Sequence, residues 1–123
     1  MKATEDRRSA ELILSADPPL LDPAAYHCQQ AGEKLLKGLL VAAGQSTPKS
    51  HDLWQFTRLV SQAVPSLEID LDTLADLTPW ATVTRYPDLD TELGITAQDI
   101  LDALSNIDRL VEAIGQLREN PTQ

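Results

Sequence analysis

Residues able to carry out binding chemistry recur along one side of the stretch AYHCQQAGEKLLKGLL, residues 25–40. An aromatic ring, an amide, an acid and a base follow at spacings of four, three and four residues; they are Tyr26, Gln30, Glu33 and Lys37. At about 100° per residue, these spacings place all four in one narrow arc of a helix. These four residues, here called the polar file, could form one wall of a polar site. The polar file could equally be a solvated face, in which Glu33 and Lys37 form a favourable pair one turn apart.

The other side of this helix is apolar and predicts a buried face. Its members are Cys28, Gly32, Leu35, Leu36, Leu39 and Ala43. His27 and Lys34 lie beside the polar file. Cys28 is the only cysteine, so the chain cannot form an internal disulfide, and we expect a packed, unreactive thiol in a cytoplasmic protein.

Two further motifs follow the helix. The stretch TPKSHDLW, residues 47–54, contains Lys49, His51, Asp52 and Leu53, and the stretch LTPWATVTRYPD, residues 77–88, contains Arg85, Tyr86 and Pro87. With the helix residues Tyr26, Gln29, Gln30, Glu33, Lys34 and Lys37, these motifs resemble the HEPN domain family (higher eukaryotes and prokaryotes nucleotide-binding). That family's common form carries an aromatic, Gln-Gln, Glu-Lys helix, then a K-x-H-D/N-L turn and later an R-Y-P element. The resemblance extends over residues 25–87, about half of the chain.

The resemblance implies a compact up-and-down helical bundle that binds a nucleotide such as ATP, with RNA as a second choice of ligand. It also implies a homodimer and a partnership with a minimal nucleotidyltransferase, often in a toxin–antitoxin pair. The expected binding residues are Tyr26, Gln30, Glu33, Lys34, Lys37, Lys49, His51, Arg85 and Tyr86. The lysines and the arginine would contact phosphate, and a tyrosine could stack on a base.

The ribonuclease motif of many HEPN proteins is absent from this sequence. That motif is an arginine followed, after four to six residues, by a histidine, which can act as an acid or base on the ribose 2′-hydroxyl. His51 would need an arginine at 44–46, and His27 would need one at 20–22, but neither segment contains an arginine. No histidine follows Arg85. We therefore do not predict the standard ribonuclease, and we expect neither a metal site nor a resident cofactor.

Composition indicates one all-α domain over residues 1–123, with frayed ends at 1–4 and 119–123. Leucine and alanine dominate the apolar residues, aromatic residues make up 4%, and no alternating β-pattern is present. Residues 1–62 contain seven Lys/Arg and seven Asp/Glu, whereas residues 63–123 contain three and twelve. A broad basic nucleic-acid surface is therefore excluded. No apolar run has the roughly 18 residues of a membrane span, so we expect a soluble protein.

Start and stop signals predict four main helices and one bent or short helix, arranged as an up-and-down bundle. The first helix is expected over Glu5–Ala16 with Thr4 as its cap, and the second over Pro23–Ala43 with Asp22 as its cap and Gly44 as its stop. Asp52 begins a third helix that ends near Ala63, and a fourth helical region covers Leu71–Thr84 with Pro79 inside it. Thr96 caps the last helix. An apolar stripe along that helix comprises Ile100, Leu101, Leu104, Ile107, Val111, Ile114 and Leu117.

Three functions remain open from the sequence. The first is a non-enzymatic HEPN bundle that binds nucleotide and works with a nucleotidyltransferase. The second is a toxin-type ribonuclease with a non-standard active centre, in which Arg85 and His51 meet only in space. The third is a protein-interaction module whose acidic C-terminal half meets a basic partner.

Overall fold

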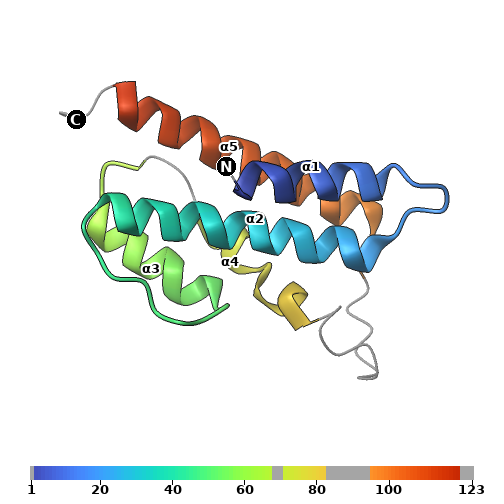
Figure 1. Ribbon diagram of the computed structural model, residues 1–123, viewed down its shortest axis with the longest axis horizontal. Helices are drawn as coiled ribbons and strands as arrows, with labels where there is room; N and C mark the ends of the chain where they lie inside the picture. The colour runs from blue at the N-terminus through green and yellow to red at the C-terminus, as the bar shows by residue number, and fades with distance from the viewer. Residues whose placement is uncertain (1, 68–70, 83–94, 120–123) are drawn as a thin grey trace.

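The computed structural model describes residues 2–67, 71–82 and 95–119, which form α-helices and one 3-10 helix (Figure 1). The elements are α1 (Lys2–Leu14), α2 (Leu21–Ala42), α3 (Leu53–Ala63), α4 (Asp72–Ala75), the 3-10 helix η1 (Thr78–Thr82) and α5 (Ala97–Glu119). The predicted fold class is confirmed: the described chain is all-α, with four longer helices and short additional ones. None of its described helices has both the length and the apolar character required to cross a lipid bilayer.

The central helix is α2, which packs against α1, α3, α5 and η1. In Figure 1, α2 and α5 run in the same direction, and α1 runs opposite to both. α1 lies along only one half of α2 and α5. The remaining half of α2 faces α3, which runs in the same direction as α2 and ends near the C-terminal end of α2.

The core consists mainly of leucine and alanine from α2 and branched residues from α5. The largest fully buried side chains include Phe56, Leu36, Leu40, Leu53, Leu74, Ile100, Ile107 and Leu110. The stripe predicted for α5 is correct at Ile100, Leu104 and Ile107, but Leu101 and Val111 are exposed. α1 covers only part of α5, so the buried face of α5 is narrower than its apolar pattern.

Local capping chemistry explains several helix ends. The Thr96 hydroxyl accepts a hydrogen bond from the Asp99 N–H at 3.1 Å, and the Asp99 carboxylate accepts one from the Thr96 N–H at 2.9 Å. This reciprocal capping box confirms the predicted start of α5. Asp52 is the N-cap of α3 and accepts from the Trp54 N–H at 3.0 Å. Gly44 adopts φ 78° and ends α2, as predicted.

Two predicted boundaries are wrong. α1 begins at Lys2, so Thr4 lies inside the helix. The N-cap of α2 is Leu20 without a side-chain hydrogen bond, so Asp22 lies in the first turn, where its charge suits the helix dipole. The helical region expected over Leu71–Thr84, with a bend or restart at Pro79, divides into α4 and the 3-10 helix η1 that contains Pro79, because proline lacks the N–H that an α-helix requires. Thr84 lies outside the described residues.

Candidate functional site

A buried carboxylate organises the polar file of α2. Glu33 is only 3% exposed, and its two oxygens contact two different basic side chains. His51 Nδ1 lies 2.7 Å from Oε1, and Lys37 Nζ donates to Oε2 at 3.4 Å. Burying a carboxylate is unfavourable unless it is paired and hydrogen-bonded. The pairing therefore explains how Glu33 is accommodated, and it fixes His51 and Lys37 on either side of one acid.

The two basic groups extend from this buried centre towards solvent. The His51 side chain is 43% exposed, and that of Lys37 is 31% exposed. Lys37 also places its ammonium group 5.3 Å from the centre of the Phe56 ring, a cation–π distance. Glu33 and Phe56 thus restrict Lys37 from two sides. A restricted lysine loses less entropy than a mobile one when it binds an anion.

Two glutamines connect α2 to the loop that carries His51. Gln29 is fully buried and donates from Nε2 to the His51 backbone carbonyl at 3.3 Å. Gln30 donates to Gln29 Oε1 at 2.7 Å, which orients the Gln29 amide. The Leu53 N–H donates to the Thr78 hydroxyl at 3.1 Å. The motif at residues 77–88 therefore begins beside the motif at residues 47–54. The loop position of His51 is therefore set by α2 and η1.

A second polar cluster lies where α1 packs on α2. Asp6 is 9% exposed, and its carboxylate accepts from Lys34 Nζ and lies 2.9 Å from His27 Nδ1. His27 and Lys34 are seven residues apart, so they stand two turns apart on α2. Lys34 therefore belongs to a helix–helix contact, and not to the Glu33 cluster as the sequence predicted.

The structure brings together only part of the predicted site. Glu33, Lys37 and His51 meet directly, and Gln30 supports them through Gln29. Other predicted residues lie elsewhere or are not described: Tyr26 packs its ring edge-on against His27 at 5.6 Å, Lys49 is exposed, and Arg85 and Tyr86 lie outside the described residues.

The comparison with family models decides the family. The HEPN domain model matches residues 1–117. The chain belongs to the HEPN family. Comparisons with curated proteins and with solved structures found no match. The resemblance seen in three motifs over residues 25–87 therefore extends through the flanking helices of this HEPN domain.

The polar file of this HEPN chain is not a solvated helix face. Gln30 and Glu33 are buried, because α2 is surrounded by other elements on most sides. The spacing on the helix separated polar from apolar residues correctly, but it left open whether the polar residues face water or form a site. Gln29, Gln30 and Glu33 are buried, and no described buried side-chain nitrogen or oxygen lacks a hydrogen bond.

Sequence reasoning missed Gln29 and Asp6 as contributors to these clusters. Gln29 was part of the family motif but lies off the file, and only its bond to a loop carbonyl reveals its role. Asp6 is one of three acids in α1, and the sequence gives no sign that it is the one that is buried. Both roles depend on contacts between segments at least 20 residues apart.

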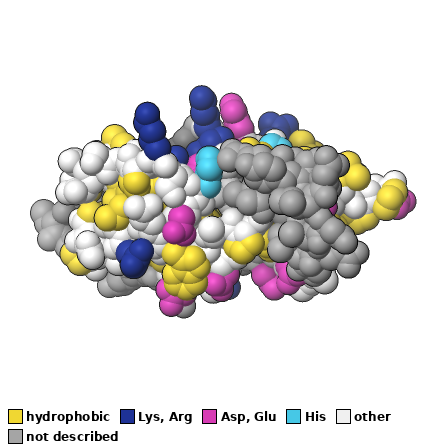
Figure 2. Space-filling view, turned by 90° about the horizontal axis from the view of Figure 1, so that it is seen from below, with side chains coloured by type: hydrophobic (Ala, Val, Ile, Leu, Met, Phe, Trp, Pro, Cys, Tyr) yellow, Lys and Arg dark blue, Asp and Glu magenta, His cyan; other side chains and the backbone are white. Residues whose placement is uncertain are grey.

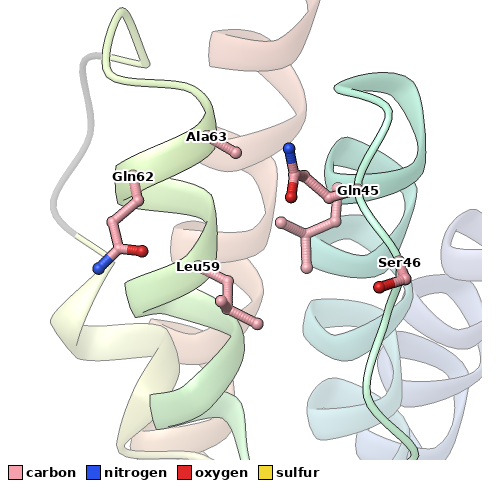
Figure 3. Close-up of a pocket in the computed structure, with 6 residues that line it drawn as sticks. Gln45, Ser46, Leu59, Gln62 and Ala63 are labelled. Carbon is pink, nitrogen blue, oxygen red and sulfur yellow. The ribbon is translucent and has the colours of Figure 1, made fainter.

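The surface of the domain carries mixed charge. In the view from below, a histidine lies close to basic side chains, and acidic side chains are interspersed (Figure 2). A small pocket of about 160 Å³ lies between α3 and the segment after α2, lined by Leu40, Gln45, Ser46, Leu59, Gln62 and Ala63 (Figure 3). It contains none of the predicted site residues, so we assign it no role.

Cys28 is fully buried on α2. Loss of solvation raises the pKa of its thiol to about 12, with a small opposing effect from the positive charge of Arg7. The thiol is therefore protonated at neutral pH and does not act as a nucleophile.

Proposed function

We propose that this HEPN protein binds the phosphate groups of a nucleotide at the Glu33 cluster and serves as the accessory partner of a minimal nucleotidyltransferase in a toxin–antitoxin-type pair. The observation that carries the binding proposal is the contact of one buried carboxylate with both Lys37 and His51. The partnership and the toxin–antitoxin role rest on family membership.

The charge of the cluster suits a phosphate. Lys37 balances the charge of Glu33, and Lys49 adds an exposed cation two residues before His51. Lysine contacts phosphate as a point charge, and a pre-positioned one does so at a smaller entropic cost. Arg85 and Tyr86 remain proposed contributors, because the family motif places them after η1. Homodimerisation also remains an expectation from the family.

A calorimetric titration with ATP and magnesium tests the binding proposal. Wild-type protein should bind in the micromolar range, and Lys37→Ala should lose at least tenfold in affinity. Arg109→Ala is the matched control, because Arg109 is an exposed cation on α5 that contacts only the side chain of Asn106 among the described residues. Absence of binding by wild type, or equal losses in both variants, would contradict the proposal. Gel filtration of this chain mixed with a minimal nucleotidyltransferase tests the partnership, because a complex would elute earlier than either protein alone.

One contact also favours a second candidate, the ribonuclease. A carboxylate that accepts from Nδ1 fixes the tautomer of a histidine and directs Nε2 away from it, as in many acid–base centres. Glu33 and His51 have this relation at 2.7 Å. Cleavage of RNA by purified protein, abolished by His51→Ala and retained by His27→Ala, would support this candidate. Absence of cleavage would leave His51 with a binding role.

A further inference from the structure

An apolar groove lies on the half of the molecule that α1 does not cover. It has a volume of about 670 Å³ and is formed by the C-terminal halves of α2 and α5 and the end of α3. Lys34 is the only charged residue among its described lining, and the ammonium of Lys34 is bound to Asp6. Figure 1 shows the N-terminal end of α1 near the middle of α2, so α1 does not extend over this half.

The shape of the groove suits a helix. Its lining on α2 runs from Lys34 to Ala42, which corresponds to about 12 Å of helix, or just over two turns. Gly38 on α2 and Gly115 on α5 both line it, and a methyl group built on either would meet nothing within 4 Å. Two glycines facing open space allow another backbone to approach closely.

The electrostatics of the groove favour a basic occupant. The C-terminal ends of α2, α3 and α5 lie at the same end of the molecule (Figure 1), and Ala43, Val64 and Leu117 from these ends line the groove. Helix C-termini carry partial negative charge. Neither α2 nor α3 has a basic residue in its last turn to compensate it.

Acidic side chains on α5 add to this field. Glu112 directly follows Val111, a residue that lines the groove and is 45% exposed. Glu112 is itself exposed and has no ion-pair partner among the described residues. The C-terminal half of α5 as a whole carries three acids, Asp108, Glu112 and Glu119, and two bases, Arg109 and Arg118. A cation at this end of the groove would therefore meet negative charge from the C-terminal ends of α2 and α3 and from Glu112, whereas α5 carries Arg118 in its own last turn.

We propose that the groove binds an amphipathic helix of a partner protein, apolar on the entering face and carrying lysine or arginine beside it. A second copy of this chain fits less well. A twofold contact would bring two concave surfaces together and place like-charged helix ends opposite each other. The groove lies on a different face of α2 from Glu33 and Lys37, so this proposal is independent of nucleotide binding.

Selection from a display library of 16-residue helical peptides against the full chain tests the proposal. We expect enriched peptides with apolar residues at positions i, i+3 or i+4 and i+7, and with more Lys/Arg than Asp/Glu. Such peptides should bind at least tenfold more weakly to Gly38→Leu and to Gly115→Leu. These substitutions fill open space at helical positions, so both variants should fold, as a thermal melt would verify.

The control variant is Ser105→Leu, which adds the same side chain to an exposed position of α5 that does not line the groove. It should bind the peptides as wild type does. The proposal is overturned if the selected peptides are acidic, if no selected peptide distinguishes Gly38→Leu from wild type, or if wild type dimerises and Gly38→Leu is monomeric. Nucleotide binding by Gly38→Leu should equal that of wild type, which separates this proposal from the preceding one.

Discussion

At the scale of single residues, Glu33 makes the contacts that hold the polar cluster together. It is the only acid of α2 that is buried, and it accepts from groups on two segments. Glu33→Gln keeps the shape of the side chain but removes the charge that compensates Lys37. We expect the free energy of unfolding to fall by about 1–3 kcal/mol, the usual cost of breaking a buried charged contact.

Urea unfolding followed by circular dichroism measures this change. Glu112→Gln is the matched control, since it makes the same substitution at an exposed position of α5. Substitutions at such sites usually change stability by no more than about 0.5 kcal/mol. Equal midpoints for the two variants would show that the Glu33 contacts contribute nothing to folding.

The Cys28 thiol gives a second prediction at this scale. Burial raises its pKa from 9.0 to about 12, so the unfolded chain loses this proton at lower pH than the folded chain. Because the folded state then binds more protons, stability should fall by about 1.4 kcal/mol per pH unit from this group as pH rises from about 9 towards 12.

Cys28→Ala separates this effect from the other groups that titrate at high pH. Unfolding free energies measured at pH 8, 9 and 10 should decline less steeply in the variant than in wild type. In addition, the native protein should not react with a thiol reagent at pH 8 until denaturant is added. Rapid modification of the folded protein would contradict the buried position of Cys28.

At the scale of elements, two glycines should respond in opposite directions to the same substitution. Gly44 ends α2 with φ 78°, a conformation that an L-residue adopts at a cost of about 1 kcal/mol. Gly38 lies inside α2 at an exposed position with open space around it. Gly44→Ala should therefore lower the free energy of unfolding by about 1 kcal/mol, and Gly38→Ala should raise it by about 0.5–1 kcal/mol.

Thermal unfolding of both variants beside wild type provides the measurement, and each variant serves as the control of the other. A loss of stability in both would mean that Gly38 is required by packing that the structure does not contain. That outcome would also weaken the use of Gly38→Leu as a probe of the groove.

The sequence predicted best those helix ends that are determined by a side chain or a glycine at the end itself. Asp52, Thr96 and Gly44 act within a few residues of themselves, so their effects are visible in the sequence. The narrow buried face of α5, by contrast, depends on packing between elements. The same division holds in the site: spacing on α2 indicated Glu33 and Lys37, but the placement of Lys34 required knowledge that Asp6 is buried beside it.

At the scale of the whole molecule, α1 is attached to its neighbours by two ion-pair clusters of different character. Asp6, nearly buried, contacts His27 and Lys34 of α2. Arg7 makes two hydrogen bonds to the Asp108 carboxylate of α5, at 2.7 and 2.9 Å, but Asp108 is 52% exposed. These bonds, followed by those to Glu11, raise the pKa of Arg7 above its ordinary value.

The two clusters should differ in energy and in response to salt. Asp6→Asn leaves the half-buried Lys34 without its acidic partner. We expect the free energy of unfolding to fall by about 1–3 kcal/mol, and this decrease should change little in 1 M NaCl. A double-mutant cycle of Arg7→Ala and Asp108→Ala should give a coupling of no more than about 1 kcal/mol, because exposed pairs are weak and screened by salt. Urea unfolding at low and high salt measures both quantities. If the Arg7–Asp108 coupling exceeded the cost of Asp6→Asn, the exposed pair and not the buried acid would be the main polar attachment of α1.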